Sequence, residues 1–435
     1  MSLEEPARRT EVFAEHEVVV LGGGPAGIAA AAAAGRAGRS TILVERYGFL
    51  GGAGTAAGLA NFCGLHANVN GEHRHVVHGI ADDILSRLKS MDALAAPHVL
   101  FGGRIQAQAY DVSAYKLVAD QVLAAAKVRP LFHALAVGYR DGHLLVETKS
   151  GRRAIGGSVF IDCSGDGDLA CWAGAPYEVG DGKGNMLYPS MMYRIGGVDP
   201  QKAGNAWERI AALMEEAERA GRRFPRKKPI LRPQPNPVEW RANLTQMRNP
   251  DGSAVSGIDA AQLSYGEAEG RRQVWDTFHF IREKAPGFER SYIADIAPQL
   301  GIRETRRIGG VYQLTEEDVL DCADFPDAIG VNGWPVEEHK AGDVEFRFQR
   351  SPRGYNQLPY RMLVPLGVDN MLVAGRCASM THGGQSAARV SGACFAMGEA
   401  AGSAAHLALR FGVAPPDLDI GELQTHLMEN GVWLG

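Results

Sequence analysis

Residues 17–27 read Glu17-Val18-Val19-Val20-Leu21-Gly22-Gly23-Gly24-Pro25-Ala26-Gly27, and this stretch decides how the chain begins to fold. The β-branched run before the glycines predicts a buried strand of a parallel sheet. The alanine-rich run that follows has Pro25 in its first turn and Gly38 just beyond its end, which predicts a helix over Pro25–Arg36. We therefore expect a sharp corner between strand and helix.

Three glycines at this corner have the spacing of a diphosphate-binding turn. Gly22 permits the tight turn, Gly24 lets the backbone approach a phosphate, and Gly27 lets the helix pack closely on the strand. The free N–H groups of the helix N-terminus would face the diphosphate. Ser40–Glu45 predicts the next strand, and Glu45 at its end can accept hydrogen bonds from an adenosine ribose. The pattern predicts a dinucleotide cofactor but does not separate FAD from NAD.

Three further glycine-bordered turns follow predicted strands: Gly51–Thr55, Cys163–Asp168 and Gly375-Arg376. Turns that return to one sheet suit a ligand longer than the adenylate half of a nicotinamide cofactor. Asp166 in the second turn could bind cofactor hydroxyls or could cap the helix after it, and the residues leave both readings open. A helix near the third turn could direct its N–H groups toward negative charge on a flavin ring.

The order of predicted elements indicates an α/β fold with discontinuous domains. A β-meander over Pro130–Asp162 and a late strand at Asn370–Ala374, followed by a small-residue helix at about Ala388–Leu409, return the chain to the first sheet. We predict a Rossmann-like FAD-binding domain with a central parallel sheet, and an inserted α+β substrate or cap domain with helices at Ala203–Arg219 and Glu267–Lys284. The predicted FAD-binding domain is 14–65, 112–198 and 355–412; the cap is 66–111 and 199–354; 1–13 is a flexible lead-in and 413–435 a C-terminal tail.

Composition narrows the class of protein. The net charge of −5 and pI near 6.2 argue against binding to nucleic acid or to an anionic membrane, so we expect neither partner. The basic run Arg222–Arg232 is broken by prolines and is expected to be a surface loop. The six cysteines form no Cys-x-x-Cys pair and suit a reducing, cytoplasmic location. Val18–Gly35 is uncharged but too rich in glycine and alanine to span a bilayer.

Five segments spread over nearly the whole chain carry a resemblance to a known family. They are Val20–Gly27, Ile161–Asp168, Leu300–Arg307, Leu358–Pro365 and Asn370–Arg376. On these segments the chain resembles the FAD-dependent oxidoreductases of the two-dinucleotide-binding-domains flavoprotein group, in the xanthan lyase-like branch. The resemblance implies a glutathione reductase-like flavoprotein fold with FAD in an extended pose and its ring between the two domains.

The resemblance also assigns cofactor-binding residues and shows two departures. The residues expected to bind FAD are Gly22, Gly24, Pro25, Ala26, Gly27, Glu45, Arg46, Gly52, Asp166, Gly375 and Arg376, with Ala136 contacting adenine through its backbone. Ser164 stands where threonine is more familiar, a small change for a hydroxyl position. Ser391-Gly392 stands where bulkier residues are expected, which bears on the geometry near the ring.

Candidate catalytic residues are titratable or cationic groups near the late glycine-rich segment. His382, in Thr381-His382-Gly383-Gly384, is the first choice for an acid or base, since imidazole titrates near neutrality; a structural hydrogen bond or covalent flavin attachment is the alternative. Arg303 and Arg306 could hold an anionic substrate or a developing enolate, or could pair with Glu304. Arg389 could likewise hold an anionic substrate or form a structural ion pair.

Four histidines, His66, His73, His75 and His78, crowd one short segment and suggest a metal. Their spacing gives no pair four residues apart on an expected helix, and no carboxylate cluster completes a ligand set. We therefore expect a polar lid loop and no metal.

The expected reaction is dehydrogenation or reduction of a small organic substrate by hydride transfer to or from flavin N5. No second Gly-x-Gly-x-x-Gly corner is present in the sequence, so a dedicated NAD(P)H domain is not expected and an external donor or acceptor exchanges electrons. The alternatives are a flavin monooxygenase and a FAD-carrying subunit of an electron-transfer or RNA-modifying complex. The expected partners are a small-molecule substrate and an external electron donor or acceptor, and a homo-oligomer is left open.

Overall fold

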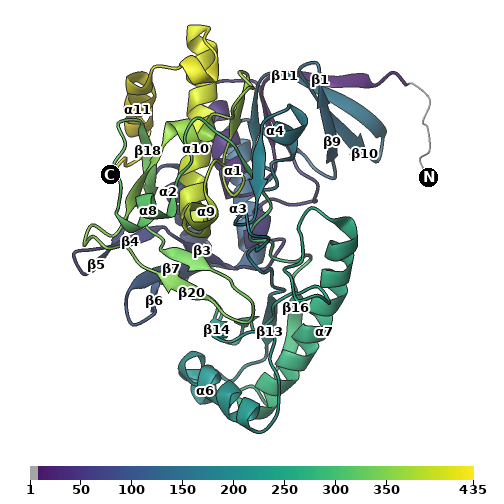
Figure 1. Ribbon diagram of the computed structural model, residues 1–435, viewed down its shortest axis with the longest axis vertical. Helices are drawn as coiled ribbons and strands as arrows, with labels where there is room; N and C mark the ends of the chain where they lie inside the picture. The colour runs from purple at the N-terminus through teal and green to yellow at the C-terminus, as the bar shows by residue number, and fades with distance from the viewer. Residues whose placement is uncertain (1–7) are drawn as a thin grey trace.

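The computed structural model describes residues 8–435, and Figure 1 shows two bodies stacked along the long axis of the molecule. The upper body is built on a seven-stranded sheet with the order β8-β2-β1-β11-β10-β9, in which β22 also pairs with β11. The bounds of these strands are β1 (Glu11–Leu21), β2 (Thr41–Val44), β8 (Arg129–Leu131), β9 (Leu135–Arg140), β10 (His143–Thr148), β11 (Gly151–Asp162) and β22 (Met371–Val373).

Parallel pairing joins β8, β2, β1, β11 and β22, whereas β11, β10 and β9 form an antiparallel meander. The long strand β11 serves both arrangements, because its first half pairs with β10 and its end pairs with β22. The carboxyl ends of β1, β2 and β11 therefore meet at one edge, where ligands bind in open α/β sheets. The α/β fold class with a parallel sheet and a meander is confirmed.

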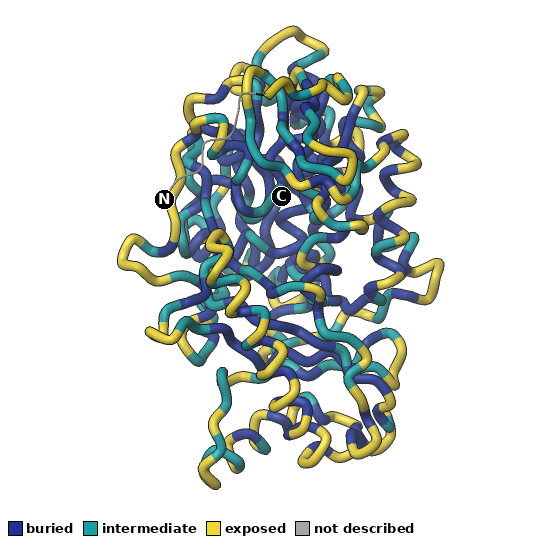
Figure 2. Tube along the Cα trace, turned by 90° about the vertical axis from the view of Figure 1, so that its right-hand side faces the viewer, coloured by how far each residue is buried: buried dark blue, intermediate teal, exposed yellow. Residues whose placement is uncertain are grey.

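Helices pack with this sheet to form the first core. Figure 2 shows buried residues gathered in the interior of the molecule, with exposed residues mainly at its periphery. The helices of the first core are α1 (Pro25–Arg36), α2 (Ile80–Ser90), α3 (Val112–Ala125), α10 (Ser391–Phe411) and α11 (Ile420–Glu429). Small residues bring α1 and α10 unusually close: a Cβ at Gly398 or Gly402 would overlap the carbonyl oxygen of Ala26 or Ala30. The glycines of α10 thus fix the position of the helix that starts at the predicted diphosphate corner.

We expect Gly402→Ala to lower the free energy of unfolding by about 2 kcal/mol, because the new methyl group meets backbone that cannot rotate away. The better helix propensity of alanine offsets only about 1 kcal/mol of this loss. Gly421→Ala, at an exposed position of α11, is the matched control: its Cβ would meet only a side-chain oxygen of Asp419, at 3.1 Å, so its effect should be much smaller. Urea unfolding of the two variants measures the difference, and equal midpoints would contradict the packing argument.

The lower body has its own antiparallel sheet, β14-β15-β13-β16, covered by long helices in Figure 1. The strands and helices of the lower body are β13 (Tyr193–Gly196), β14 (Ile230–Pro233), β15 (Trp240–Asn243), β16 (Tyr292–Ile296), α5 (Pro200–Ala203), α6 (Ala206–Arg219) and α7 (Ala260–Lys284). Buried side chains between Met191 and Leu300 form this second core. The helix expected over 203–219 is thus α6 preceded by a short separate turn, and the helix expected over 267–284 begins earlier, at Ala260.

Shorter elements connect the two bodies and cover the first. They are β3 (Asn61–Cys63), β4 (His66–Val69), β5 (Glu72–His75), β6 (His98–Leu100), β7 (Ile105–Ala109), β12 (Tyr177–Val179), β17 (Arg306–Ile308), β18 (Ala328–Asn332), β19 (Val336–Glu338), β20 (Glu345–Arg347), β21 (Asn356–Pro359), α4 (Asp168–Trp172), α8 (Glu316–Leu320) and α9 (His382–Ala388). Three 3-10 turns complete the chain, η1 (Gly52–Gly54), η2 (Tyr360–Leu363) and η3 (Pro415–Asp417).

Packing differs from the expected division of the chain, and α11 of the expected C-terminal tail packs in the first core. Helix α2, which we assigned to the cap with 66–111, packs in the first core, and so do buried residues from Ile308 to Val336. Within the lead-in expected at 1–13, residues 1–7 lie outside the described residues, whereas residues 11–13 belong to β1 and pair alongside β11. The predicted late helix begins at Ser391 rather than Ala388, because α9 ends there and Arg389–Val390 separates the two helices.

Candidate active site

One cavity of about 1060 Å³ runs from the Gly22–Gly24 corner into the region between the two cores. The predicted cofactor residues that line it are Gly22, Gly24, Pro25, Ala26, Glu45, Arg46, Gly52, Ala136, Asp166, Gly375 and Arg376. Gly27 does not line it; a Cβ there would overlap the carbonyl oxygen of Gly22, so this glycine lets helix and strand pack. The structure therefore brings the residues expected to hold a dinucleotide to one cavity.

The glycine corner has the shape of a diphosphate cradle. Gly24 is the N-cap of α1 and provides no side chain to cap the first helical turn. The backbone of Gly52 approaches Gly24 so closely that a Cβ on Gly52 would lie 2.7 Å from the Gly24 Cα. Because these glycines have no side chains, an anionic ligand can approach the backbone beside the N-terminus of α1.

Glu45 closes the adenosine side of the corner. Its carboxylate is buried and accepts hydrogen bonds from the backbone N–H of Gly23 (2.7 Å) and of Tyr47 (3.0 Å). These two bonds hold the loop after β1 against the end of β2, so Glu45 lies where the sequence placed it. Arg46 is more exposed, and its Nη1 lies 3.9 Å from the carboxylate of Asp166.

The turn after β11 is fixed by a buried carboxylate. Asp162 accepts hydrogen bonds from the N–H and hydroxyl of Ser164 and from the N–H of Ala170, while burial raises the pKa of Asp162 to about 6. Asp166 does not cap α4, whose N-cap is Gly167 with no side-chain bond. Instead Asp166 accepts a hydrogen bond of 2.9 Å from Arg376 at the edge of the cavity, which removes the capping alternative.

The sequence profile of a family described as "FAD dependent oxidoreductase" matches residues 17–427. The chain belongs to this family. The FAD-dependent oxidoreductase is thus an enzyme whose cofactor is FAD, and the cradle, the buried Glu45 and the Asp166–Arg376 pair provide donors and space that fit this group.

Solved structures of similar outline are distant in sequence. A geranylgeranyl bacteriochlorophyll reductase-like protein from Thermoplasma acidophilum is 12% identical, with a TM-score of 0.45, over 95% of this chain and 83% of that chain. The p-nitrophenol 4-monooxygenase PnpA from Pseudomonas putida DLL-E4 is 12% identical, with a TM-score of 0.48, over 97% and 89%. No curated protein matches the sequence significantly.

The far end of the cavity holds polar residues that sequence reasoning did not assign to the site. Arg303, predicted as catalytic, lines it together with Arg226, Arg241, Glu337 and His339. Arg226 belongs to the basic run expected to be a surface loop, yet it is only 2% exposed. The prolines correctly predict a loop over 222–229, whereas 230–232 belong to β14, and no local signal shows that the loop folds inward.

Arg306 does not line the cavity. Its Nη1 donates to the carboxylate of Asp168 (2.7 Å) and to the carbonyl oxygen of Asp166 (3.1 Å). Asp168 does line the cavity. Arg306 therefore fixes the position of the turn that contains Asp166 and Asp168, without lining the cavity itself. The expectation that Arg306 contacts substrate therefore has no support from its position.

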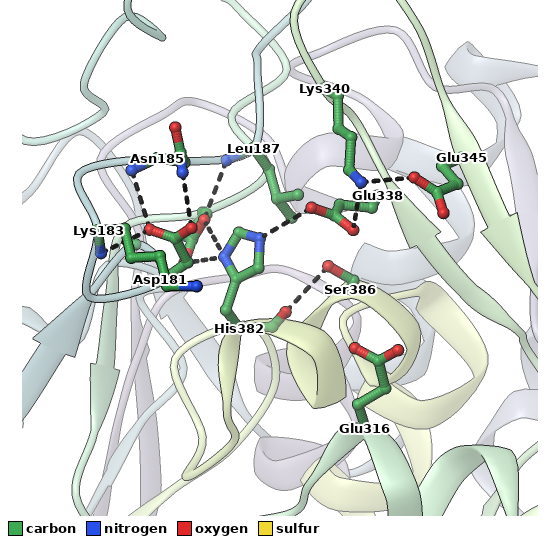
Figure 3. Close-up of polar contacts among 12 residues, drawn as sticks. Asp181, Lys183, Asn185, Leu187, Glu316, Glu338, Lys340, Glu345, His382 and Ser386 are labelled. Atoms are coloured by element: carbon green, nitrogen blue, oxygen red, sulfur yellow. Dashed lines mark hydrogen bonds and ion pairs between the residues drawn. The ribbon is translucent and has the colours of Figure 1, made fainter.

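His382 also lies away from the cavity lining, as the first residue of α9 (Figure 3). Its Nδ1 lies 3.0 Å from Glu304 and its Nε2 lies 3.8 Å from Glu338. Burial alone would lower the pKa of His382, but the hydrogen bond to Glu304 and the ion pair with Glu338 outweigh burial and raise the pKa to about 9. A protonated histidine between Glu304 and Glu338 joins the segment before β17, β19 and α9, which is a structural role.

We expect the stability that His382 contributes to be lost in alkaline solution. Because its pKa in the fold, about 9, lies above the ordinary 6.5, the contribution is complete below about pH 6.5 and is lost as the pH rises through about 9. His382→Gln should therefore lower the free energy of unfolding by about 1–3 kcal/mol near pH 6 and far less near pH 10. Urea unfolding at the two pH values tests this, and a loss independent of pH would contradict it.

The small residues at the start of α10, unexpected from the resemblance, have a packing reason. A Cβ at Gly392 would overlap the carbonyl oxygen of Gly64, and the hydroxyl of Ser391 donates to the carbonyl of Cys63 (3.0 Å) and accepts from its N–H (2.9 Å). The helix N-terminus is thereby held against β3 at the cavity wall.

The histidine-rich segment forms the hairpin of β4 and β5 and the turn before α2. His75 and His78 each lie 3.0 Å from a different oxygen of Asp82, and the three possible ligand atoms lie within 4.8 Å of one another. Asp82 on α2 is thus the carboxylate that the sequence reasoning did not find. The absence of a metal remains a prediction that metal analysis of the purified protein tests.

No helix among residues 8–435 combines the length and the apolarity that crossing a membrane requires.

Proposed function

We propose that the protein dehydrogenates or reduces a small organic substrate that binds between the two cores, beside FAD. The observation that carries this proposal is the single cavity that joins the glycine cradle to the pocket formed by Arg303, Glu337 and His339. A cofactor held at one end leaves the other end for a second molecule. Bound FAD supplies the hydride acceptor or donor.

His339, rather than His382, is the acid or base of this proposal. It lines the cavity, is 4% exposed, and its Nε2 lies 3.0 Å from the carboxylate of Glu337. Burial and then the positive charge of Arg303 lower the pKa of His339 well below its usual value, so the ring is neutral. Since a carboxylate accepts, Nε2–H donates to Glu337 and the other ring nitrogen is free of a proton.

Glu337 orients this ring and is not itself a base near neutral pH. Its carboxylate accepts from His339 and from Trp334 Nε1 (2.9 Å), and these bonds with the nearby Arg389 outweigh burial and hold the pKa of Glu337 below its usual value. In the dehydrogenation direction, a carbon of the substrate loses a hydride to the cofactor and His339 takes the accompanying proton. The substrate thereby loses two electrons and two protons in all, one of the protons within the hydride.

The test mixes the purified holoenzyme anaerobically with a panel of small organic metabolites, without any nicotinamide cofactor. We expect one chemical class to bleach the yellow absorbance of oxidised flavin, or to reoxidise the reduced enzyme. Bleaching by NAD(P)H alone, followed by oxygen uptake and hydroxylation of an added compound, would instead indicate a monooxygenase. Flavin that responds only when a co-purified protein is present would indicate a subunit of a larger complex.

A further inference from the structure

Four arginines surround the far end of the cavity without a carboxylate partner. Arg226, Arg241 and Arg303 are 2%, 5% and 6% exposed, and Arg389 is partly buried beside them. Among residues 8–435, none of the four forms an ion pair with an aspartate or glutamate. Arg307, the other buried arginine among the described residues, is matched to the carboxylates of Glu178 and Glu304, so this cluster is distinctive.

Backbone carbonyl groups satisfy only part of the donor capacity of this arginine cluster. Arg303 donates to the carbonyl of Tyr188 (2.6 Å), Arg241 to that of Leu59, and Arg389 to that of Glu337 (3.3 Å). Each guanidinium has five N–H donors. In Arg241, Arg303 and Arg389, these carbonyl groups bond only one of the two Nη groups. Donors therefore remain for a ligand in the cavity.

The carboxylate of Glu337 acts electrostatically on all four arginines. Asp343 also acts on Arg226 and Glu304 on Arg389, but each is already in an ion pair, Asp343 with Lys228 and Glu304 with Arg307. Glu337 is already bonded to Trp334 and His339. Four guanidinium groups beside one carboxylate leave three formal positive charges, because His339 is neutral. Buried charges of one sign are costly unless an opposite charge offsets them. A multiply charged anion is the ligand that this site lacks.

Resting on the proposed function, we propose that the substrate is an organic acid with at least two carboxylates, bound by Arg226, Arg241, Arg303 and Arg389. Guanidinium groups match carboxylates with paired hydrogen bonds. Arg226 and Arg241 come from the second core and Arg389 from the segment between α9 and α10, so the charges approach from different walls. That arrangement fits several anionic groups spread over one carbon skeleton better than a single phosphate.

The cavity wall also provides surface for the carbon skeleton. Phe62, Trp334 and Phe346 line the same cavity. Arg303 contributes to the lowered pKa of His339, so a carboxylate that offsets this charge would raise the basicity of the ring when substrate is bound. Binding of the acid beside Arg303 would thereby increase the affinity of His339 for a proton.

The test measures binding to the oxidised holoenzyme without turnover, by perturbation of the flavin spectrum and by calorimetry. The probes are acetate, succinate, citrate, inorganic phosphate and glycerol phosphate. We expect Kd to fall at least tenfold from acetate to succinate or citrate. Arg241→Gln and Arg303→Gln should each raise the Kd of the tighter probe at least tenfold, and the lysine variants should restore part of the affinity.

Arg282→Gln, an exposed arginine of α7 outside the cavity, is the matched control and should leave Kd unchanged. If a glutamine variant does not fold, the lysine variant is compared with wild type instead. Equal Kd values for all anions, tighter binding of the phosphates, or insensitivity to the arginines would overturn the proposal. Because no redox step is measured, failure of every compound to bleach the flavin would overturn the proposed function without altering this result.

Discussion

Replacing Gly24 with aspartate is expected to remove FAD from a protein that remains folded. Gly24 is the N-cap of α1, its φ of −76° is accessible to any residue, and the nearest atom to a new Cβ is 3.7 Å away. Aspartate is a favourable N-cap and should stabilise the helix by about 1 kcal/mol. The same carboxylate would occupy the cradle and repel the cofactor diphosphate.

The expected result is a Kd for FAD raised about 10²-fold or more, with an unfolding midpoint of the apoprotein equal to or above that of wild-type apoprotein. Gly24→Asn is the matched control, since it fills the same space and caps the helix without charge. Its loss of affinity should be smaller by at least tenfold at low salt, a gap that closes as salt is added. Flavin absorbance of dialysed protein measures both variants. Equal losses for Asp and Asn would show that space, and not charge, decides binding.

Local sequence was sufficient to predict the cofactor end of the site. The strand, corner and helix around Gly22–Gly27 are adjacent in the chain, and Glu45 follows within one βαβ unit, so propensity and spacing determine their geometry. Asp166 and Gly375-Arg376 follow strands of the same sheet, and parallel strands end at a shared edge. These residues line one cavity, as expected from the sequence, although their contacts with FAD remain predictions.

The substrate end could not be predicted because long-range packing determines it. Arg226 lies in a charged, proline-broken run typical of a surface loop, and only the approach of the second core to the first buries it. His339 has no motif around it, whereas His382 sits in a conspicuous glycine-rich segment and yet faces Glu304 and Glu338. The conspicuous glycine-rich motif thus contains His382, which forms ion pairs away from the cavity. Tertiary contacts, and no local motif, place His339 at the cavity.

His339→Gln is expected to slow flavin reduction by the substrate about 10²-fold or more while FAD stays bound. Glutamine retains a hydrogen-bond donor for Glu337 and similar bulk, so the change removes mainly the nitrogen that takes the proton. Rapid mixing of holoenzyme with substrate under anaerobic conditions measures the rate. The pH profile should also change, because the wild-type rate follows a histidine pKa that binding of an anion beside Arg303 raises toward neutrality.

His382→Gln is the control for this experiment, since its ring is held by two carboxylates away from the cavity lining. Its reduction rate should stay within about twofold of wild type, even though its stability falls near neutral pH. The reverse pattern, slow reduction in His382→Gln and fast reduction in His339→Gln, would show that His382 and not His339 transfers the proton. A slow rate in both variants with unchanged pH dependence would mean that neither ring moves the proton, because loss of a titrating base must alter the profile as well as the rate.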